Sequence, residues 1–195
     1  ANGAEIIDIS LPLSPYALPT YYIIQPAAAS SNLARFDGMR YGTRAPGALE
    51  DSYLTARSEG FGLEVKRRIM LGSFILSAGY YDAFYKKSLA VRNALRKEFD
   101  EAFKQVDVII SPTTPGTAWK LGEKFDDPIA MYLADVFTTP ANIAGLPGIS
   151  IPCGFANDLP VGLQLQAKPF DEMTMYKAAA AYQTLTDWHT KVPQA

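Results

Sequence analysis

The sequence is poor in the two side chains that most often build redox and metal sites. It has one cysteine, Cys153, and one histidine, His189. A single cysteine forms no disulfide within the chain, and such cysteine usage is typical of the reducing cytoplasm. One histidine and one cysteine also fall short of the ligand set of a zinc site. We therefore expect a cytoplasmic protein that holds no metal and no cofactor of its own.

Neither sign of charge dominates. The chain has 18 Lys and Arg against 20 Asp and Glu, a net charge of -2, which argues against nucleic-acid binding through bulk charge. No apolar run reaches the roughly 20 residues that a membrane helix needs. The first residues, ANGAEIIDIS, lack the basic and apolar regions of a signal peptide. We expect no membrane partner, and a hydrophobic content of 48% is enough for a folded core.

Apolar strands alternate with segments of helical periodicity, which indicates an α/β fold with a covered sheet. The helical pattern between residues 64 and 105 is too long for one ordinary helix, so we expect two helices separated near Gly79. Residues 21–36 are expected to begin as a helix or a strand and to run into a small-residue helix. The other expected helices are residues 127–145 with Gly145 at the C-terminus, and residues 172–188 capped by Asp171. The expected strands are residues 5–10, 106–112, 148–154 and 161–167.

Several residues are candidate nucleophiles by type. Cys153 could act with His189 as its base, but it ends an apolar strand, where a small thiol packs like an aliphatic side chain. Ser30, Ser31 and Ser111 lie outside any GxSxG turn. Helix capping or turn formation accounts for these serines. We expect no catalytic residue in this chain.

The segment EVKRRIMLG places Arg67 and Arg68 directly before an apolar run, so one arginine is expected to turn inward. A buried guanidinium needs an anion, and its planar fork suits a carboxylate. Asp135 lies within a mostly apolar expected helix, where a buried acid needs a cation or donor partner. Two interpretations stay open. Arg68 pairs internally with Asp135 or Glu64, or Arg68 and Asp135 hold the carboxylate and ammonium of a zwitterionic ligand.

Five segments, in the order of the family, give the chain a resemblance to amidase-signature proteins. They are ALPTYYIIQPAAASSNLARFDGMRYG, SEGFGLEVKRRIMLGSFILSAGYYDAFYKKS, DVIISPTTP, DVFTTPANIAGLPGISIPCG and PVGLQLQAKPFDE. The pattern P-x-N-x-x-G-x-P-G-x-S-x-P-x-G is shared by amidases generally. RFDGMRYG and the GYYDAFYKK run are more similar to the glutamine-hydrolysing subunits of tRNA-dependent amidotransferases. The resemblance implies part of the amidase-signature fold, α/β with a mixed sheet covered by helices on both faces.

The resemblance also implies an activity and its partners. A Ser–cis-Ser–Lys triad releases ammonia from glutamine, and the ammonia passes to partner subunits B and C. The complex uses ATP and Mg to convert mischarged Glu-tRNA(Gln) to Gln-tRNA(Gln), so contact with tRNA is indirect. Glutamine is held by a tyrosine, an arginine and an aspartate, which match Tyr21, Arg68 and Asp135, with Tyr22 as an alternative to Tyr21. This match favours the ligand interpretation over the internal pair.

The chain differs from the family in the segments that contain the catalytic residues. A GGSSGGS-like segment, which bears both serines, is absent, as is the upstream lysine. The resemblance thus implies that residues 1–195 are the C-terminal portion of one amidase domain, inactive alone. Apolar surface and open strand edges left by a missing half predict self-association or instability. Two alternatives stay open: part of another small-amide amidase, or a noncatalytic interaction module in which Arg68 and Asp135 only pair.

Overall fold

The computed structural model describes residues 3–123 and 127–192. The chain divides into two compact units. Unit 1 comprises Ala1–Leu18 and Val91–Ala195, and unit 2 is Pro19–Ala90. The assignment of residues 1–195 to one amidase domain stays a prediction. Across the described residues, the helices are too short or too polar for any of them to cross a membrane.

Unit 2 is helical. The expected small-residue helix is confirmed as α1, and the expected break near Gly79 is confirmed, because α3 ends at Ile75 and Gly79 has a positive φ of 84°. A π-helical segment follows the break and continues directly into α4. The elements are α1 (Ala17–Leu33), α2 (Leu49–Gly60), α3 (Leu63–Ile75), the π-helix (Tyr81–Lys86) and α4 (Lys87–Ala102), of which unit 2 holds α1 from Pro19 and α4 to Ala90.

Two helices of unit 2 touch through their backbones. A Cβ added to Gly72 of α3 would lie 1.9 Å from the carbonyl oxygen of Pro26 in α1. Glycine is therefore required at this position for α1 and α3 to approach this closely. Tyr21 and Arg68, two of the residues expected to bind glutamine, lie on these same two helices.

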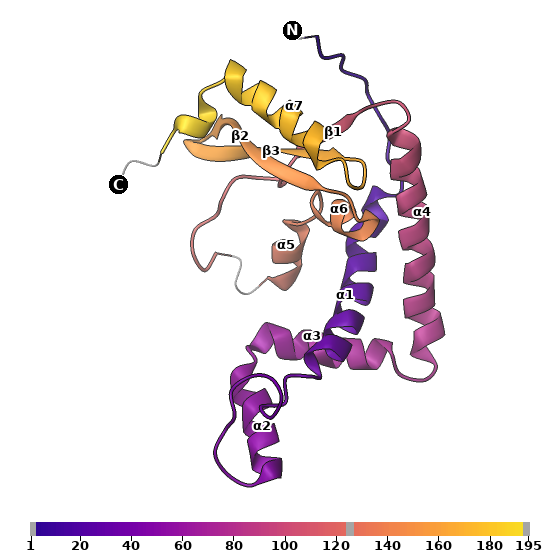
Figure 1. The fold of residues 1–195 in the computed structure, drawn as a ribbon, viewed down its shortest axis with the longest axis vertical. Helices are drawn as coiled ribbons and strands as arrows, with labels where there is room; N and C mark the ends of the chain where they lie inside the picture. Colours follow the sequence, from indigo (N-terminus) through magenta and orange to yellow (C-terminus); the bar gives the residue numbers. More distant parts are fainter. Residues whose placement is uncertain (1–2, 124–126, 193–195) are drawn as a thin grey trace. The chain divides into compact units, whose positions relative to one another are not determined.

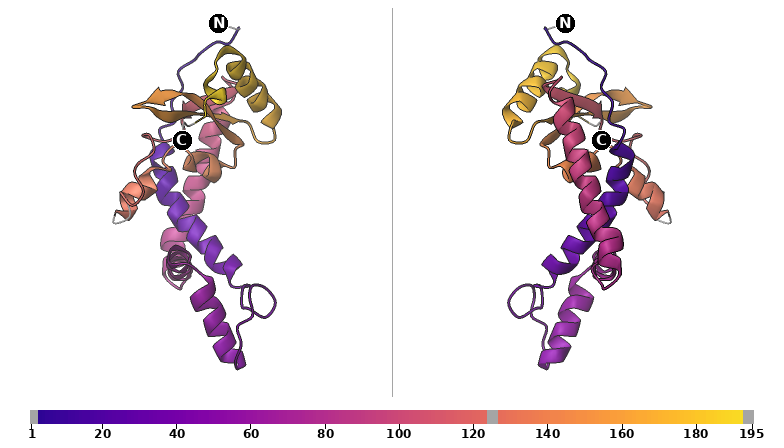
Figure 2. Two further views of the ribbon diagram at one scale, coloured as in Figure 1. Left: turned by 90° about the vertical axis from the view of Figure 1, so that its left-hand side faces the viewer. Right: turned by 90° about the vertical axis from the view of Figure 1, so that its right-hand side faces the viewer.

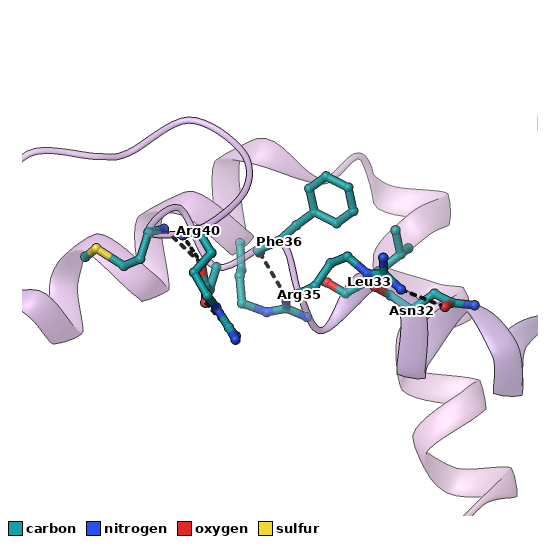
Figure 3. A network of polar contacts seen from close by, with 8 residues as sticks. Asn32, Leu33, Arg35, Phe36 and Arg40 are labelled. Carbon is teal, nitrogen blue, oxygen red and sulfur yellow. Dashed lines mark hydrogen bonds and ion pairs between the residues drawn. The ribbon is translucent and has the colours of Figure 1, made fainter.

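The end of α1 is held by arginines. Arg57 of α2 donates through Nη1 to the carbonyl oxygens of Leu33 (3.1 Å) and Phe36 (3.2 Å). Arg35 folds back onto Asn32, whose carbonyl and side-chain oxygens accept from it at 3.0 and 3.1 Å (Figure 3). These bonds satisfy carbonyl groups that a helix end leaves without intrahelical partners.

Unit 1 contains a three-stranded sheet, and three of the four expected strands are confirmed: β1 (Val108–Pro112), β2 (Gly148–Ala156) and β3 (Leu159–Ala167). The strand order is β1-β3-β2, and both pairings are antiparallel. The expected mixed sheet is therefore wrong for the described residues. The reason is local for β2 and β3, since Asn157 and Asp158 have positive φ angles of 50° and 62° and form a two-residue hairpin turn.

Helices cover both faces of the sheet, as expected. Helix α7 (Glu172–Leu185) packs on one face, and the predicted cap is confirmed because the Asp171 side chain accepts from the Thr174 N–H. Ile109 of β1 packs with residues of α4 and of α6 (Thr139–Ala144) on the other face. Figures 1 and 2 show α7 and α6 on opposite sides of the sheet. The α7 side buries Ile151, Leu165, Ala167, Met175 and Ala179, and the opposite cluster contains Phe99, Ala102, Phe103, Ile109 and Ala144.

Two expectations in unit 1 are wrong. Residues 5–10 form no strand, and Ile9 and Leu11 instead pack against the cluster built on α4. The expected helix 127–145 is two short helices, α5 (Pro128–Leu133) and α6, joined by a turn over residues 134–138. Pro140 accounts for this break, since proline suits the first turn of a helix, whereas in a helix interior it lacks the N–H that bonds the carbonyl four residues earlier and clashes with that carbonyl. Gly145 ends α6 in the left-handed conformation, as expected.

Candidate functional site

Arg68 is the centre of a polar cluster inside unit 2. Its Nε donates to Glu64 Oε1 at 2.9 Å, one helical turn earlier on α3. Its Nη1 donates to Gln25 Oε1 (2.9 Å) and to the Tyr21 hydroxyl (3.2 Å), both on α1. Three of the five guanidinium N–H groups are thus engaged, which fixes the plane of the group.

The remaining donor atom of Arg68 is Nη2. Within the described part of unit 2, Nη2 donates no hydrogen bond, and the side chain keeps 22% of its surface exposed. The guanidinium carbon lies 5.6 Å from the ring centre of Tyr22 and 6.0 Å from that of Tyr21. Cation–π attraction of this kind favours a fixed guanidinium. The arrangement can therefore present Nη2 to an incoming anion.

The charge of Arg68 is secure. Burial alone disfavours a charged guanidinium, but the hydrogen bonds with Glu64 and Tyr21 outweigh it and raise the pKa of Arg68 above its ordinary value. Arginine is protonated at every physiological pH in any case. Any anion that binds here meets a permanent positive charge.

Tyr21 and Tyr22 differ in how they meet Arg68. The Tyr21 hydroxyl accepts a hydrogen bond from Nη1, so its own O–H proton is left to donate elsewhere. The two rings meet edge to face, with centroids 5.2 Å apart. The match of the substrate-binding tyrosine to Tyr21 or Tyr22 stays a prediction, and the hydrogen bond to Arg68 supports Tyr21.

Asp135 lies in unit 1 and differs from its expected setting. It is exposed, and it occupies the turn between α5 and α6 instead of an apolar helix, so the argument from a buried acid is wrong. Its carbonyl oxygen accepts from the Thr139 N–H (2.9 Å) and the Thr138 hydroxyl (3.3 Å). Among the described residues of unit 1, the carboxylate has no partner. It is thus available to a cation.

One member of the cluster escaped sequence analysis. Gln25 holds Arg68 as closely as Glu64 does, with both distances at 2.9 Å. A signal was available, because Gln25 follows Tyr21 by four residues and therefore shares its face of a helix. The ion pair between Arg68 and Glu64, one of the two internal pairs left open, is present in the structure.

The candidate nucleophiles make structural contacts. Cys153 donates through Sγ to the Val161 carbonyl oxygen, and His189 is exposed in a short 3-10 helix. The hydroxyls of Ser30 and Ser31 both donate to the Ala27 carbonyl oxygen one helical turn earlier. No group of three metal-ligating side chains occurs within residues 3–123 and 127–192. These contacts agree with the structural interpretation of the four residues.

The family of the chain is decided by a match over most of its length. The amidase family model matches residues 1–175. The chain belongs to the amidase family. Its resemblance to a subunit of tRNA-dependent amidotransferases is confirmed as well. It is 58% identical over 194 residues to the A subunit of the glutamyl-tRNA(Gln) amidotransferase of Roseiflexus castenholzii, and 55% identical over 193 residues to that of Pseudomonas aeruginosa.

Solved structures with a similar fold were also found. The crystal structure of the same type of subunit, from the glutamyl-tRNA(Gln) amidotransferase of Thermotoga maritima, is 43% identical, with a TM-score of 0.61 over 86% of this chain and 32% of that one. A 6-aminohexanoate cyclic dimer hydrolase, 19% identical, has a TM-score of 0.73 over 99% of this chain and 40% of its own, which shows the fold alone. The Roseiflexus match covers 99% of this chain but only 40% of that relative.

Proposed function

We propose that the chain is the C-terminal part of the glutamine-hydrolysing subunit of a tRNA-dependent amidotransferase, and that it contributes the glutamine pocket. The observation that carries this proposal is the fixed guanidinium of Arg68. Its Nε and Nη1 donate to Glu64, Gln25 and Tyr21, whereas the two N–H groups of Nη2 have no acceptor among the described residues of unit 2. Similarity over nearly the whole chain to the corresponding subunits of glutamyl-tRNA(Gln) amidotransferases supports it.

Each proposed contact matches one polar group of glutamine. Nη2 of Arg68 donates to the α-carboxylate in a charge-assisted hydrogen bond, which is about twice as strong as one between neutral groups. The Tyr21 O–H donates to the same carboxylate. The Asp135 carboxylate accepts from the α-ammonium. Recognition of both charged ends would distinguish glutamine from simple amides, because a site left with unpaired polar groups rejects the smaller substrate.

The chemistry belongs to another segment in this proposal. The sequence contains no GGSSGGS-like segment, so the serine that forms the acyl-enzyme, and the lysine that moves its proton, lie outside these residues. The chain alone is therefore inactive. In the whole enzyme, ammonia would pass to subunits B and C, which use ATP and Mg to amidate the mischarged tRNA in the cytoplasm.

A second candidate function rests on the internal pairing of Arg68. Three of its donors already have protein partners, including Glu64 at 2.9 Å. A cluster satisfied in this way could serve only to join α1 to α3 in a noncatalytic interaction module. Such a module predicts that Arg68 contributes to stability and leaves substrate selection unchanged.

Glutamine hydrolysis by the full-length subunit in its complex separates the two candidates. We expect Arg68→Ala to lower kcat/KM for glutamine by about 10- to 100-fold, the effect of losing a hydrogen bond to a charged group. Hydrolysis of butanamide, which has neither carboxylate nor ammonium, should change little. Arg67→Ala is the matched control, since Arg67 is the next residue and also pairs with Glu64. Equal losses on both amides would favour the module.

A further inference from the structure

Gln164 is a buried polar side chain on the face of the sheet opposite α7. It is 5% exposed, and it stands in register with Ser111 of β1 and Ser150 of β2. Its Nε2 donates to the carbonyl oxygen of Phe137 (2.9 Å) and to the Ser111 hydroxyl (3.1 Å). A primary amide has two N–H donors on one nitrogen, so both are used.

The carbonyl that Gln164 binds belongs to the turn of Asp135. Phe137 is two residues after Asp135 in the turn over residues 134–138. Inside the turn, the Asp135 carbonyl oxygen accepts from Thr139 N–H, and the Thr138 carbonyl oxygen accepts from the Asn142 side chain at 3.3 Å. Those bonds set the internal shape of the turn. The bond from Gln164 ties that shape to the sheet.

We propose that Gln164 is a positioning residue: through Phe137 it fixes the turn that presents the Asp135 carboxylate to the ammonium of bound glutamine. This inference rests on the proposed function, in which Asp135 contacts the ammonium. Gln164 touches no substrate atom. A ligand contact needs its carboxylate held within a fraction of an ångström, and a turn anchored to a strand is held more firmly than a free loop.

The amide is the chemical group that this place requires. Phe137 and Ser111 both offer oxygen atoms to the buried nitrogen. A glutamate would face these acceptors with further acceptors, and a methionine of similar size would supply no donor. A histidine at this position would still supply one ring N–H, at a distance from the backbone similar to that of the Gln164 amide nitrogen. Gln164→Met should therefore release the turn, and Gln164→His should restore part of the anchoring.

The test is steady-state hydrolysis of glutamine and butanamide by the full-length subunit in its complex. We expect Gln164→Met to raise KM for glutamine about tenfold, with kcat within about threefold, because binding and not chemistry is lost. Gln164→His should recover part of this change, and butanamide hydrolysis should be unaffected. In an Asp135→Asn background, Gln164→Met should add less than about twofold, since both variants remove one interaction.

Gln166 supplies the matched control. It lies two residues along β3 on the same face, is 4% exposed, and its Oε1 has no partner among the described residues. Gln166→Met should leave KM for glutamine unchanged. If Asp135→Asn raises KM and Gln164→Met does not, this inference falls and the proposed function stands. If Asp135→Asn leaves KM unchanged, both fall. Equal losses on glutamine and butanamide would reduce Gln164 to a structural residue and overturn the inference.

Discussion

At the scale of single residues, the proposed glutamine site depends on how its side chains are held. Arg68 has partners on three of its donors, and Asp135 stands exposed on a turn. Orientation and charge are thus supplied before any ligand arrives. Preorganised groups of this kind lose little entropy on binding, which is where much of their contribution to affinity comes from.

The roles of the two tyrosines beside Arg68 can be distinguished by removing the hydroxyl group of each in turn. Tyr21→Phe deletes the hydroxyl that accepts from Arg68 at 3.2 Å. We expect kcat/KM for glutamine to fall about tenfold, the effect of one hydrogen bond to a charged group. Tyr22→Phe should change it by less than about twofold. The reverse order in glutamine hydrolysis by the full-length subunit would assign the substrate contact to Tyr22.

Asp37 gives unit 2 a pH dependence. The backbone N–H groups of Arg40 and Met39 hold the pKa of Asp37 down to about 2, against an ordinary 3.8. The ionised carboxylate therefore stabilises the folded state above about pH 4, and this contribution disappears as the pH falls from about 4 to about 2. Asp37→Ala should lower the melting temperature at pH 7, and the difference from the native chain should shrink across that window.

The control for this titration is Asp100→Ala, an exposed acid on α4. Its melting temperature should follow that of the native chain at every pH. Thermal unfolding recorded by circular dichroism between pH 2 and pH 7 supplies the comparison. A deficit for Asp37→Ala that stays constant over the whole range would show that the carboxylate acts through packing and not through its charge.

At the scale of elements, the crossing of α1 and α3 is the contact that brings Tyr21 and Arg68 together. Gly72→Ala would place a methyl group 1.9 Å from the Pro26 carbonyl oxygen, which the helices can only relieve by separating. We expect a loss of about 3 kcal/mol in the free energy of unfolding, the upper part of the range for overpacking. Urea denaturation measures it.

Gly60→Ala is the matched control for the helix crossing, because no atom lies within 4 Å of a Cβ added at Gly60. It should be neutral or slightly stabilising, since alanine has the higher helix propensity. Comparable losses for Gly60→Ala and Gly72→Ala would mean that the close approach of α1 and α3 contributes nothing special.

The elements also show how far sequence reasoning reaches. Strands β1, β2 and β3 and the break near Gly79 were predictable because period, proline and glycine act locally. Residues 5–10 have a strand-like pattern, but a strand forms only where a neighbouring strand pairs with it. Ile9 and Leu11 instead make apolar contacts with the α4 cluster. The same limit applies to the site. The match of Arg68 could be made from its motif, whereas the anchoring by Gln25 and Gln164 depends on contacts between distant segments.

At the scale of the whole molecule, exposed apolar side chains indicate an interface with another chain. On α3, Met70, Leu71 and Phe74 are 73%, 45% and 50% exposed. Apolar side chains gathered on one helix usually mark an interface. We predict that the chain self-associates, with a sedimentation coefficient that rises with concentration. A single monomeric species that unfolds cooperatively would contradict this prediction.

The central claim is that these residues recognise glutamine while the reactive groups lie on another segment. Ammonia release from glutamine tests it most directly, measured for the chain alone and for the chain mixed with the amino-terminal half of the same subunit. We expect no release by the chain alone, release on mixing, and loss of that release with Arg68→Ala. Ammonia released by the chain alone would contradict the account, and Cys153 and Ser111 would then be the first candidates for a nucleophile.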